Sequence, residues 1–405
     1  MKVFVVHNRY QQTGGEDQVV ESEARLLSVA GYRVVRHDRD NREIETYSLL
    51  RKAWLPATTI WSGKSLRDVR RTLRNEAPDI AHFHNTFPLI SPAAYTACKE
   101  AGVPVVQTLH NYRLLCPAAT FLREGVPCEL CLGKKAPWPG VVHACYRESR
   151  AQTGVVGAML AIHRTIGTWS NDVDTYIALS EFAKRKFIEG GIPPSMIVVK
   201  PNFVDPDPGV DRNPENYALF VGRLSHEKGL KTLLVAWKLV GHSLPLLILG
   251  DGPLRSDLES SVREWGLSEV RFGGLVPREA VWAAMKRARF LIVPSECYEN
   301  FPTVIIEAFA CGLPVIGART GAIQEMLENQ QTGRLFSRAN PEDLAAKLDL
   351  AWTRPREMEA MGRAGRSEYV AKYTAGQNIR MLTEIYERAL QSRHGGSPSG
   401  MGTHA

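Results

Sequence analysis

The sequence has no apolar run long enough to cross a membrane as a helix, which takes about 20 consecutive apolar residues. We also expect no secretory leader, because the opening MKVFVVHNRY has an apolar run of only four residues and no cleavage pattern after it. We expect this stretch to be a first β-strand. We therefore expect a cytoplasmic protein whose seven cysteines stay reduced.

The features of a nucleic-acid-binding protein are missing too. The chain has no basic tail, no basic clusters interleaved with aromatic residues and no recognisable nucleic-acid module. We therefore expect no nucleic-acid partner. The formal net charge is nevertheless +7, and residues 1–200 carry all of it, with 26 Lys and Arg against 19 Asp and Glu. Such a basic half indicates an anionic substrate or an anionic membrane face.

What the sequence does contain is a repeated alternation of short apolar strands with helical patterns. Near-continuous β-branched runs separated by helices favour parallel sheets covered on both faces. The 405 residues are enough for two or three domains. We predict an α/β fold with two tandem, doubly wound, Rossmann-like domains facing across a cleft. The expected strands are 2–8, 32–38, 79–84, 103–110, 175–180, 217–224, 245–250, 270–274, 289–295 and 313–318.

A stretch rich in Pro, Asp and Asn, KPNFVDPDPGVDRNPEN, interrupts the alternation and is typical of a linker. The Gly/Ser-rich end of the chain is expected to be disordered. The domains that we assign are 1–203, with a Cys-rich insertion at 112–148; a linker at 204–216; a second domain at 217–372; a C-terminal helix at 373–393; and a tail at 394–405.

Two cations surround a strand-to-helix loop in the second domain. In FVGRLSHEKGL, Arg223 ends a strand and Lys228 precedes the next helix. Backbone amides at a helix start, together with cations, make an anion site. The alternative is that both side chains are ordinary solvated surface charges.

Two glutamates bracket an apolar run in SECYENFPTVIIEAFACGLPVI. Pro302 and Gly312 are the expected start and end of a helix, so Glu299 lies in the loop before it and Glu307 lies within it. Both carboxylates can face the cleft and accept hydrogen bonds from hydroxyl groups. The alternative is that Glu299 caps the helix and Glu307 pairs with a buried Arg or Lys.

The first domain offers a glycine pair and a histidine at strand ends. Gly14 and Gly15 follow the first strand, where glycine lets the backbone approach a ligand closely. His110 ends a central strand and faces the cleft. The alternatives are a plain loop for the glycines and a core histidine bonded to the backbone for His110.

Glu299 and Glu307 with seven residues between them, and GRLSHEKG upstream, resemble the retaining glycosyltransferases of family 4, which have the GT-B fold. The resemblance runs from the first strand to about residue 390. It implies that His110 and Glu299 lie at the reacting sugar, and that the first domain is on the acceptor side. The donor-binding positions that it implies are Gly14, Gly15, Arg223, Lys228, Asn300, Phe301, Thr303 and Glu307.

The resemblance implies transfer of a hexose from a UDP- or GDP-sugar, with retained configuration, to a cell-surface polysaccharide or lipid-linked glycan. No cofactor is required, because cations take up the charge of the departing diphosphate. We interpret the three Asp-x-Asp motifs at 38–40, 172–174 and 205–207 as chance matches to a metal-binding pattern. Two alternatives remain: a sugar-nucleotide epimerase of similar fold, and a non-catalytic scaffold that binds a membrane or a partner protein.

Four cysteines cluster in the sequence directly after His110. Cys128-x2-Cys131 has metal-ligand spacing, and Cys116 and Cys145 bracket it. A structural zinc ion would organise this loop-rich segment, with His143 as an alternative ligand to Cys145. The other hypotheses are reduced, unliganded thiols and a redox or cluster role. Cys98, Cys297 and Cys311 are expected to be ordinary buried thiols.

The stretch KSLRDVRRTLR (64–74) repeats basic residues at helical spacing and follows two tryptophans, Trp54 and Trp61. A basic amphipathic helix beside exposed aromatic residues can rest on an anionic membrane. A solvated helix face is the alternative. The membrane hypothesis predicts a peripheral protein on the inner face of the cell membrane.

Overall fold

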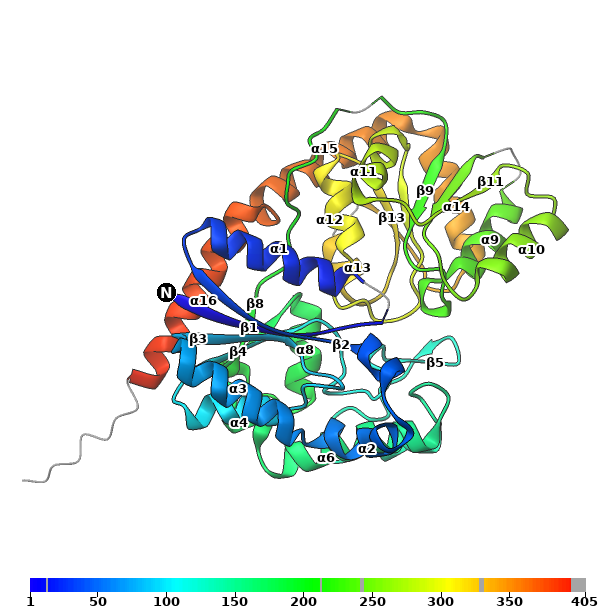
Figure 1. Cartoon of the computed structure of the whole chain (residues 1–405). Coiled ribbons are helices and arrows are strands. Elements are labelled where there is room, and N and C mark those ends of the chain that lie inside the picture. Colours follow the sequence, from blue (N-terminus) through cyan, green and yellow to red (C-terminus); the bar gives the residue numbers. More distant parts are fainter. Residues whose placement is uncertain (12–13, 212, 241–243, 328–330, 395–405) are drawn as a thin grey trace, which may run out of the picture.

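The computed structural model describes residues 1–11, 14–211, 213–240, 244–327 and 331–394, so the tail beyond residue 394 lies outside the described residues. Two lobes face each other, each built on a parallel six-stranded sheet with helices on both sides (Figure 1). The predicted fold class, a pair of Rossmann-like domains, is confirmed.

The first sheet has the order β2-β1-β3-β4-β7-β8. Its strands are β1 (Lys2–Arg9), β2 (Arg33–Asp40), β3 (Ile80–Asn85), β4 (Val105–Leu109), β7 (Thr175–Ala178) and β8 (Ile197–Val199). Its helices are α1 (Gly15–Val29), α2 (Leu49–Ile60), α3 (Gly63–Glu76), α4 (Ala93–Glu100), α6 (Arg150–Thr165), α7 (Thr168–Asn171) and α8 (Glu181–Glu189), with 3-10 turns η1 (Asn41–Thr46) and η2 (Pro194–Met196). The Cys-rich insertion holds β5 (Leu122–Arg123), β6 (Val126–Pro127) and α5 (Trp138–Val142).

The second sheet has the order β11-β10-β9-β12-β13-β14. Its strands are β9 (Ala218–Val221), β10 (Leu246–Leu249), β11 (Val270–Gly274), β12 (Leu291–Val293), β13 (Val315–Ala318) and β14 (Gly333–Phe336). The remaining helices are η3 (His226–Lys228), α9 (Leu230–Leu239), α10 (Arg255–Glu264), α11 (Arg278–Arg287), α12 (Thr303–Ala310), α13 (Gly321–Met326), α14 (Pro341–Thr353), α15 (Pro355–Lys372) and α16 (Ala375–His394).

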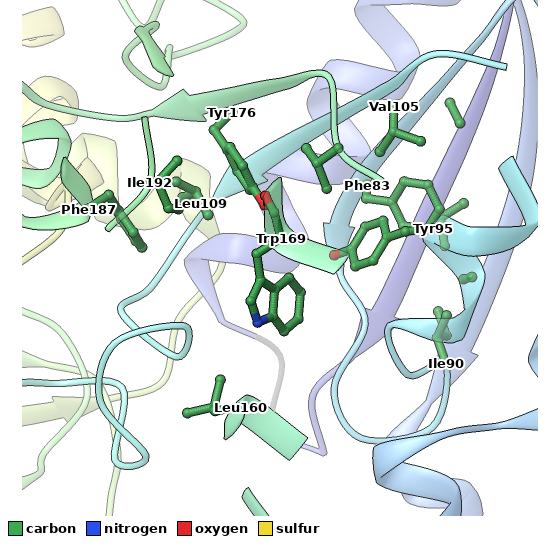
Figure 2. Close-up of a cluster of buried hydrophobic side chains, with 14 of the residues drawn as sticks. Phe83, Ile90, Tyr95, Val105, Leu109, Leu160, Trp169, Tyr176, Phe187 and Ile192 are labelled. Carbon is green, nitrogen blue, oxygen red and sulfur yellow. The ribbon is translucent and has the colours of Figure 1, made fainter. Parts of the chain in front are cut away.

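Burial on both faces explains why the strands are so apolar. In the first domain, Phe83, Tyr95, Trp169 and Tyr176 pack into one cluster beneath the sheet (Figure 2). Burying large side chains of this kind stabilises the fold by about 1.5–3 kcal/mol each. The sheets are therefore rigid supports, and the loops at their strand ends are free to carry function.

The last helix, α16, returns from the second lobe to the first (Figure 1). Its apolar residues Leu382, Ile385 and Tyr386 are buried in one cluster with Val3 and Val5 of β1. The C-terminal helix thus completes the core of the N-terminal domain. It ties the two lobes together through a second crossover, which lies beside the linker where Val204 pairs with Thr374.

The lobes also meet directly on the side where their strands end. The carboxylate of Glu325 in α13 accepts hydrogen bonds from the backbone N–H groups of Glu181 and Phe182, at 2.9 and 2.7 Å. These are the free amides of the first turn of α8, which a negative charge stabilises. The arrangement fixes the orientation of the two lobes close to the strand ends.

Within the described part of the chain, no helix is both long enough and apolar enough to cross a bilayer. The predicted basic helix forms as α3, with Lys64, Arg67, Arg71 and Arg74 exposed. Lys64 and Arg71 both pair with Asp68.

Candidate active site

The centre of the candidate site is an ion pair between two loops of the second domain. Lys228 ends the turn η3 after β9, and Glu299 lies in the loop between β12 and α12. The Lys228 Nζ donates to Glu299 Oε1 at 2.6 Å, and the hydroxyl of Ser295 donates to the same oxygen at 2.7 Å. Lys228 and Glu299 are 71 positions apart in the sequence. The sequence analysis placed Lys228 among the donor-binding positions and Glu299 at the reacting sugar, and the structure brings the two into contact.

Electrostatics keep both members of this pair charged. Burial disfavours the charged form of Lys228, but the Glu299 carboxylate outweighs burial and raises the pKa of Lys228. Burial likewise acts to raise the pKa of Glu299, and the Lys228 ammonium outweighs it and lowers that pKa. The site thus holds a fixed positive charge beside a fixed carboxylate. A phosphate ester with many hydroxyl groups can pair its phosphate with Lys228 and donate hydrogen bonds from its hydroxyls to Glu299.

Glycines allow the loops around this pair to touch. Gly229, directly after Lys228, has φ +68°, and a Cβ there would overlap the carbonyl oxygen of Pro294. Gly250, at the end of β10, has φ +133°, and a Cβ there would overlap the carbonyl oxygen of Gly222. Larger residues would push the strand-end loops apart. Gly250 lies in LILGDG, a glycine-rich strand end that the sequence analysis did not single out.

Arg223 and Glu307 come from the same two chain segments as the pair, the one after β9 and the one from β12 to α12. Arg223 follows β9 and is exposed. Glu307 lies within α12, where its Oε1 accepts from Arg278 Nε of α11 at 3.0 Å. Burial raises the pKa of Glu307, although Arg278 opposes the shift. The structure thus shows the arginine partner that the sequence left open as an alternative, and Arg278 itself was not predicted.

The start of α12 meets the first domain. The methylene of Gly15 faces the Thr303 hydroxyl closely enough that a Cβ on Gly15 would lie 3.6 Å from it. The Asn300 side chain donates to the carbonyl oxygen of Leu109 at 2.6 Å, one residue before His110. The predicted positions Gly14, Gly15, His110, Asn300 and Thr303 therefore converge. Phe301 is partly buried, and its ring packs 6.0 Å from that of Tyr373.

His110 follows β4 and is held by a second histidine. Its Nε2 lies 2.9 Å from the Nδ1 of His84, and the two rings stack 5.2 Å apart. Burial keeps the pKa of both imidazoles well below the ordinary value. His110 is thus neutral near pH 7, with a fixed ring orientation at the edge of the sheet that faces the second lobe.

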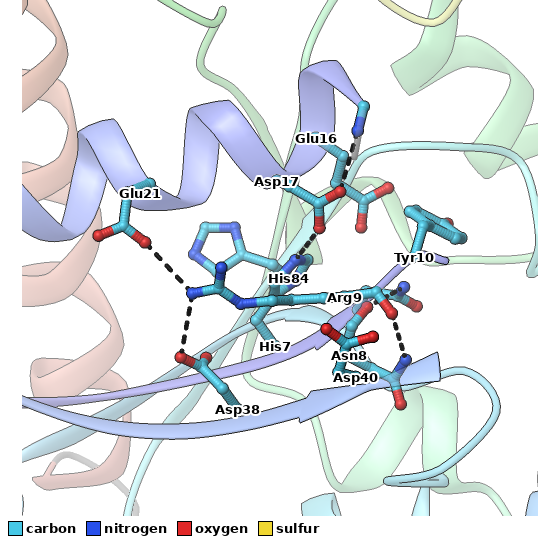
Figure 3. A network of polar contacts seen from close by, with 12 residues as sticks. His7, Asn8, Arg9, Tyr10, Glu16, Asp17, Glu21, Asp38, Asp40 and His84 are labelled. Carbon is cyan, nitrogen blue, oxygen red and sulfur yellow. Dashed lines mark hydrogen bonds and ion pairs between the residues drawn. The ribbon is translucent and has the colours of Figure 1, made fainter. Parts of the chain in front are cut away.

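Glu16 is a candidate site residue that the sequence analysis missed. It follows Gly15, and the amide of Asn111 donates to its Oε2 at 3.4 Å and to the Tyr10 hydroxyl at 3.1 Å. Figure 3 shows Glu16 beside Asp17 and close to Tyr10. Burial and the Asp17 charge raise the pKa of Glu16 to about 8. A carboxyl group with such a pKa is a candidate functional group, and its place directly after the glycine pair was the available signal.

A buried polar cluster supports this edge of the first domain. Glu23, His82 and His84 place ligand atoms within 4.8 Å of one another. The Lys200 ammonium, however, already donates to Glu23 Oε2 at 2.8 Å, and it would repel a metal cation. His82 also bonds to the hydroxyls of Tyr386 and Thr108, at 2.7 and 2.8 Å. The cluster is therefore an ion pair with hydrogen-bonded histidines, and it links α16 to β3.

This cluster predicts a specific loss of stability in acid. Burial lowers the pKa of His82 to about 4, so the unfolded chain takes up a proton near pH 6.5 that the folded chain refuses. Stability should fall as pH drops from 6.5 to 4.5, by about 2–3 kcal/mol from His82 alone. Urea unfolding at both pH values measures the loss. In His82→Gln the loss of stability should be smaller by that amount. An unchanged loss would show that the lowered pKa of His82 is not its cause.

The three Asp-x-Asp motifs lie apart in the structure, and each is engaged in ion pairs. Asp40 pairs with Arg42, Asp172 with Lys99, and Asp207 with Arg366. This arrangement fits their interpretation as chance matches. The four cysteines proposed as metal ligands, in contrast, line a single cavity.

Two family models match this chain, one in each lobe. Residues 13–208 match the family described as Glycosyltransferase Family 4, and residues 205–368 match that described as Glycosyl transferases group 1. The two matches meet at the linker between the domains.

Individual relatives show the same likeness at low identity. An uncharacterized glycosyltransferase of Methanocaldococcus jannaschii is 28% identical over 214 residues, which are 53% of this chain and 59% of that protein. Alpha-D-kanosaminyltransferase of Streptomyces kanamyceticus is 24% identical over 358 residues, 85% of each chain. With most curated relatives, the match spans about half of the relative's length.

Among solved structures, the Anabaena protein HepE in complex with UDP is similar to this chain. The TM-score is 0.68 at 16% identity, and the match covers 96% of this chain and 100% of that one. At this level of identity the likeness shows a shared fold.

Proposed function

Because the chain belongs to the family 4 (group 1) glycosyltransferases with the GT-B fold, we propose that it transfers a hexose from a UDP- or GDP-sugar, with retained anomeric configuration. The acceptor that we propose is a cell-surface polysaccharide or a lipid-linked glycan. The observation that carries the proposal is the Lys228–Glu299 pair, which lies at the strand ends facing the first domain.

The second domain supplies the charge for the departing diphosphate. Breaking the sugar–phosphate bond leaves negative charge on the phosphate oxygens, and Lys228 and Arg223 lie at the strand end where it develops. The first amides of α12, from Thr303 on, add the positive end of a helix. Preorganised charge of this kind is usually the largest catalytic term. We therefore propose that transfer needs no divalent metal.

Glu299 and Glu307 act as hydroxyl acceptors in this proposal. Glu299 binds hydroxyls of the donor sugar, while Lys228 holds its carboxylate ionised. Glu307 binds the two hydroxyls of the ribose, and Arg278 orients it from the other side. The UDP complex of the structurally similar Anabaena protein supports a nucleotide donor.

His110 completes the site on the first domain. It is neutral and partly exposed, so it can hydrogen-bond to the sugar beside the reacting carbon without adding charge. A double displacement would require a carboxylate nucleophile on the opposite face of the sugar. No residue is assigned that role, and we propose that the acceptor attacks from the face that the diphosphate leaves, with the phosphate oxygen accepting its proton.

The first domain also carries a surface suited to a peripheral membrane role on the inner face of the cell membrane. Leu49, Leu50 and Trp54 of α2 are 86, 78 and 68% exposed, beside the exposed basic residues Arg51 and Lys52. Apolar side chains flanked by cations favour an anionic bilayer surface. Sedimentation with anionic but not with neutral vesicles tests this role, and equal sedimentation with both would contradict the electrostatic part.

The transferase proposal is tested by a thermal-shift screen of nucleoside diphosphates and their sugars, followed by turnover of the best donor. We expect UDP or GDP at 100 times its Kd to stabilise the protein by about 2.7 kcal/mol. Sugar transfer should then depend on an added acceptor. Isomerisation of the donor would indicate an epimerase, and no shift with any nucleotide would indicate a scaffold; either result would overturn the proposal.

A further inference from the structure

We propose that Cys116, Cys128, Cys131 and Cys145 bind a structural zinc ion that holds the Cys-rich segment against the second domain. The four side chains, which come from three separate stretches of this segment, line one cavity of about 10 Å³. A volume of that order accommodates about one water-sized sphere. The cavity therefore has room for a single ion and excludes an organic ligand. No three of the four sulfurs lie within 4.8 Å of one another, so binding would draw them inward onto the ion.

The ligand chemistry points to zinc. Four thiolates in a tetrahedron are a typical closed structural zinc site, and Cys128-x2-Cys131 has the spacing of one ligand pair. The Nη1 of Arg123 lies 3.5 Å from His143 Nδ1, and the guanidinium interacts electrostatically with Cys128 and Cys145. The guanidinium thus lies against His143 and supports a thiolate from outside the ligand set. We therefore assign the fourth ligand to Cys145 and not to His143.

The segment needs such a support because burial holds only part of it: Tyr112, Leu115 and Phe121 lie in the core of the first domain, but little regular structure holds the rest. Its strands β5 and β6 have two residues each, and α5 has five. Large apolar side chains stay exposed here, with Val126 at 50% and Trp138 at 61%. Within the described residues, nine non-glycine residues have positive φ, and six of these lie in this segment: Ala119, Phe121, Glu124, Ala144, Arg147 and Glu148. Strained backbone persists only where its surroundings hold it.

The hairpin next to the cysteines reaches the second domain. Cys128 continues β6, with its N–H donating to the carbonyl oxygen of Phe121 at 2.7 Å. At the tip of the hairpin, the carbonyl oxygen of Gly125 accepts from Arg338 of the second domain at 3.0 Å. Glu124 and Gly125 form one wall of a cavity of about 390 Å³ whose other wall includes His226 and Gly229, beside Lys228. An ion at the four cysteines would thus fix a wall next to the donor site.

Metal analysis of the full-length protein is the direct test. Protein purified without chelator should contain about one zinc per chain. Replacement by Co²⁺ should give the intense visible bands and thiolate charge-transfer bands of tetrahedral cobalt. Protein without bound zinc that also gives no such bands with Co²⁺ would overturn the proposal. So would a non-reduced mass showing disulfides among these cysteines. None of these readouts depends on glycosyltransferase activity. They therefore test the zinc proposal independently of the proposed function.

Single substitutions identify the ligands. Cys128→Ser and Cys145→Ser should each lower zinc content at least about tenfold. The matched control, Cys98→Ala, removes a buried thiol outside the segment and should retain wild-type zinc, as should His143→Ala. Loss of zinc from His143→Ala but not from Cys145→Ser would contradict the four-thiolate assignment.

Trypsin digestion of the wild-type chain tests the anchoring role even if the variants do not fold. The segment offers cleavage sites at Arg113, Arg123, Lys134, Lys135 and Arg147. A strong chelator should speed cleavage at these sites at least about tenfold, because metal loss frees the folded segment. Cleavage elsewhere in the first domain should not change. Equal cleavage with and without chelator would contradict the anchoring role.

Discussion

Replacing Lys228 with methionine should lower donor-sugar turnover by at least about 100-fold, the usual cost of removing one preorganised donor of charge stabilisation. Methionine keeps the length of the side chain and removes the ammonium that lies 2.6 Å from Glu299. The variant loses the positive charge that stabilises the departing diphosphate, and it also leaves Glu299 buried without its partner. Steady-state kinetics with the nucleotide sugar identified in the screen measures the effect.

Lys238→Met is the matched control for this substitution. Lys238 lies on α9, is exposed, and contacts the ring of Trp265 instead of the site. We expect turnover within about twofold of wild type, because surface substitutions seldom matter. Circular dichroism of both variants checks the fold. A folded Lys228→Met enzyme with near-normal turnover would remove Lys228 from the mechanism.

Replacing Glu307 with alanine should lower kcat/KM for the donor by about 100-fold. A carboxylate that accepts from two hydroxyls makes two charge-assisted hydrogen bonds, each worth about 1.5–3 kcal/mol. In the variant, water can accept hydrogen bonds from the same hydroxyls, which recovers part of the lost binding energy. The ribose does not react, so the loss should appear mainly as a raised KM.

Arg278→Met separates ligand binding by Glu307 from its ion pair within the protein. This variant breaks the 3.0 Å contact between Arg278 and Glu307 but keeps the carboxylate. We expect a loss of less than about tenfold, because the hydroxyl acceptor is still present. If Arg278→Met and Glu307→Ala are equally impaired, the role of Glu307 is structural, and the ribose assignment is wrong.

The long apolar strands could be predicted from the sequence because their composition alone marks burial on both faces. Two strands, β8 and β14, were missed for different reasons. β8 has three residues and directly follows a proline-containing turn, and β14 includes Arg334 in its four residues. Arg334 is buried in an ion pair with Glu357 of α15, a partner that lies 23 residues away. No local pattern reveals such a pairing.

The candidate site could be predicted where its residues lie in contiguous motifs, and not where it depends on distant partners. The loops with Lys228 and Glu299 stood out through their glycines, prolines and charges. The link between Asn300 and Leu109 spans 191 residues and requires the two lobes to be docked. The histidine contact between His84 and His110 depends on β3 and β4 being neighbours. Sheet order thus decides which strand-end residues touch, and a single sequence does not encode it locally.

The role of the cations in the second lobe can be tested most directly by calorimetric titration with a nucleoside diphosphate and the matching monophosphate. Wild-type protein should bind the diphosphate at least about tenfold more tightly, a difference of about 1.4 kcal/mol. The double variant Arg223→Ala/Lys228→Met should lose that preference while still binding the nucleoside part through Glu307. A double variant that keeps the full preference for the diphosphate would contradict the assignment of both residues.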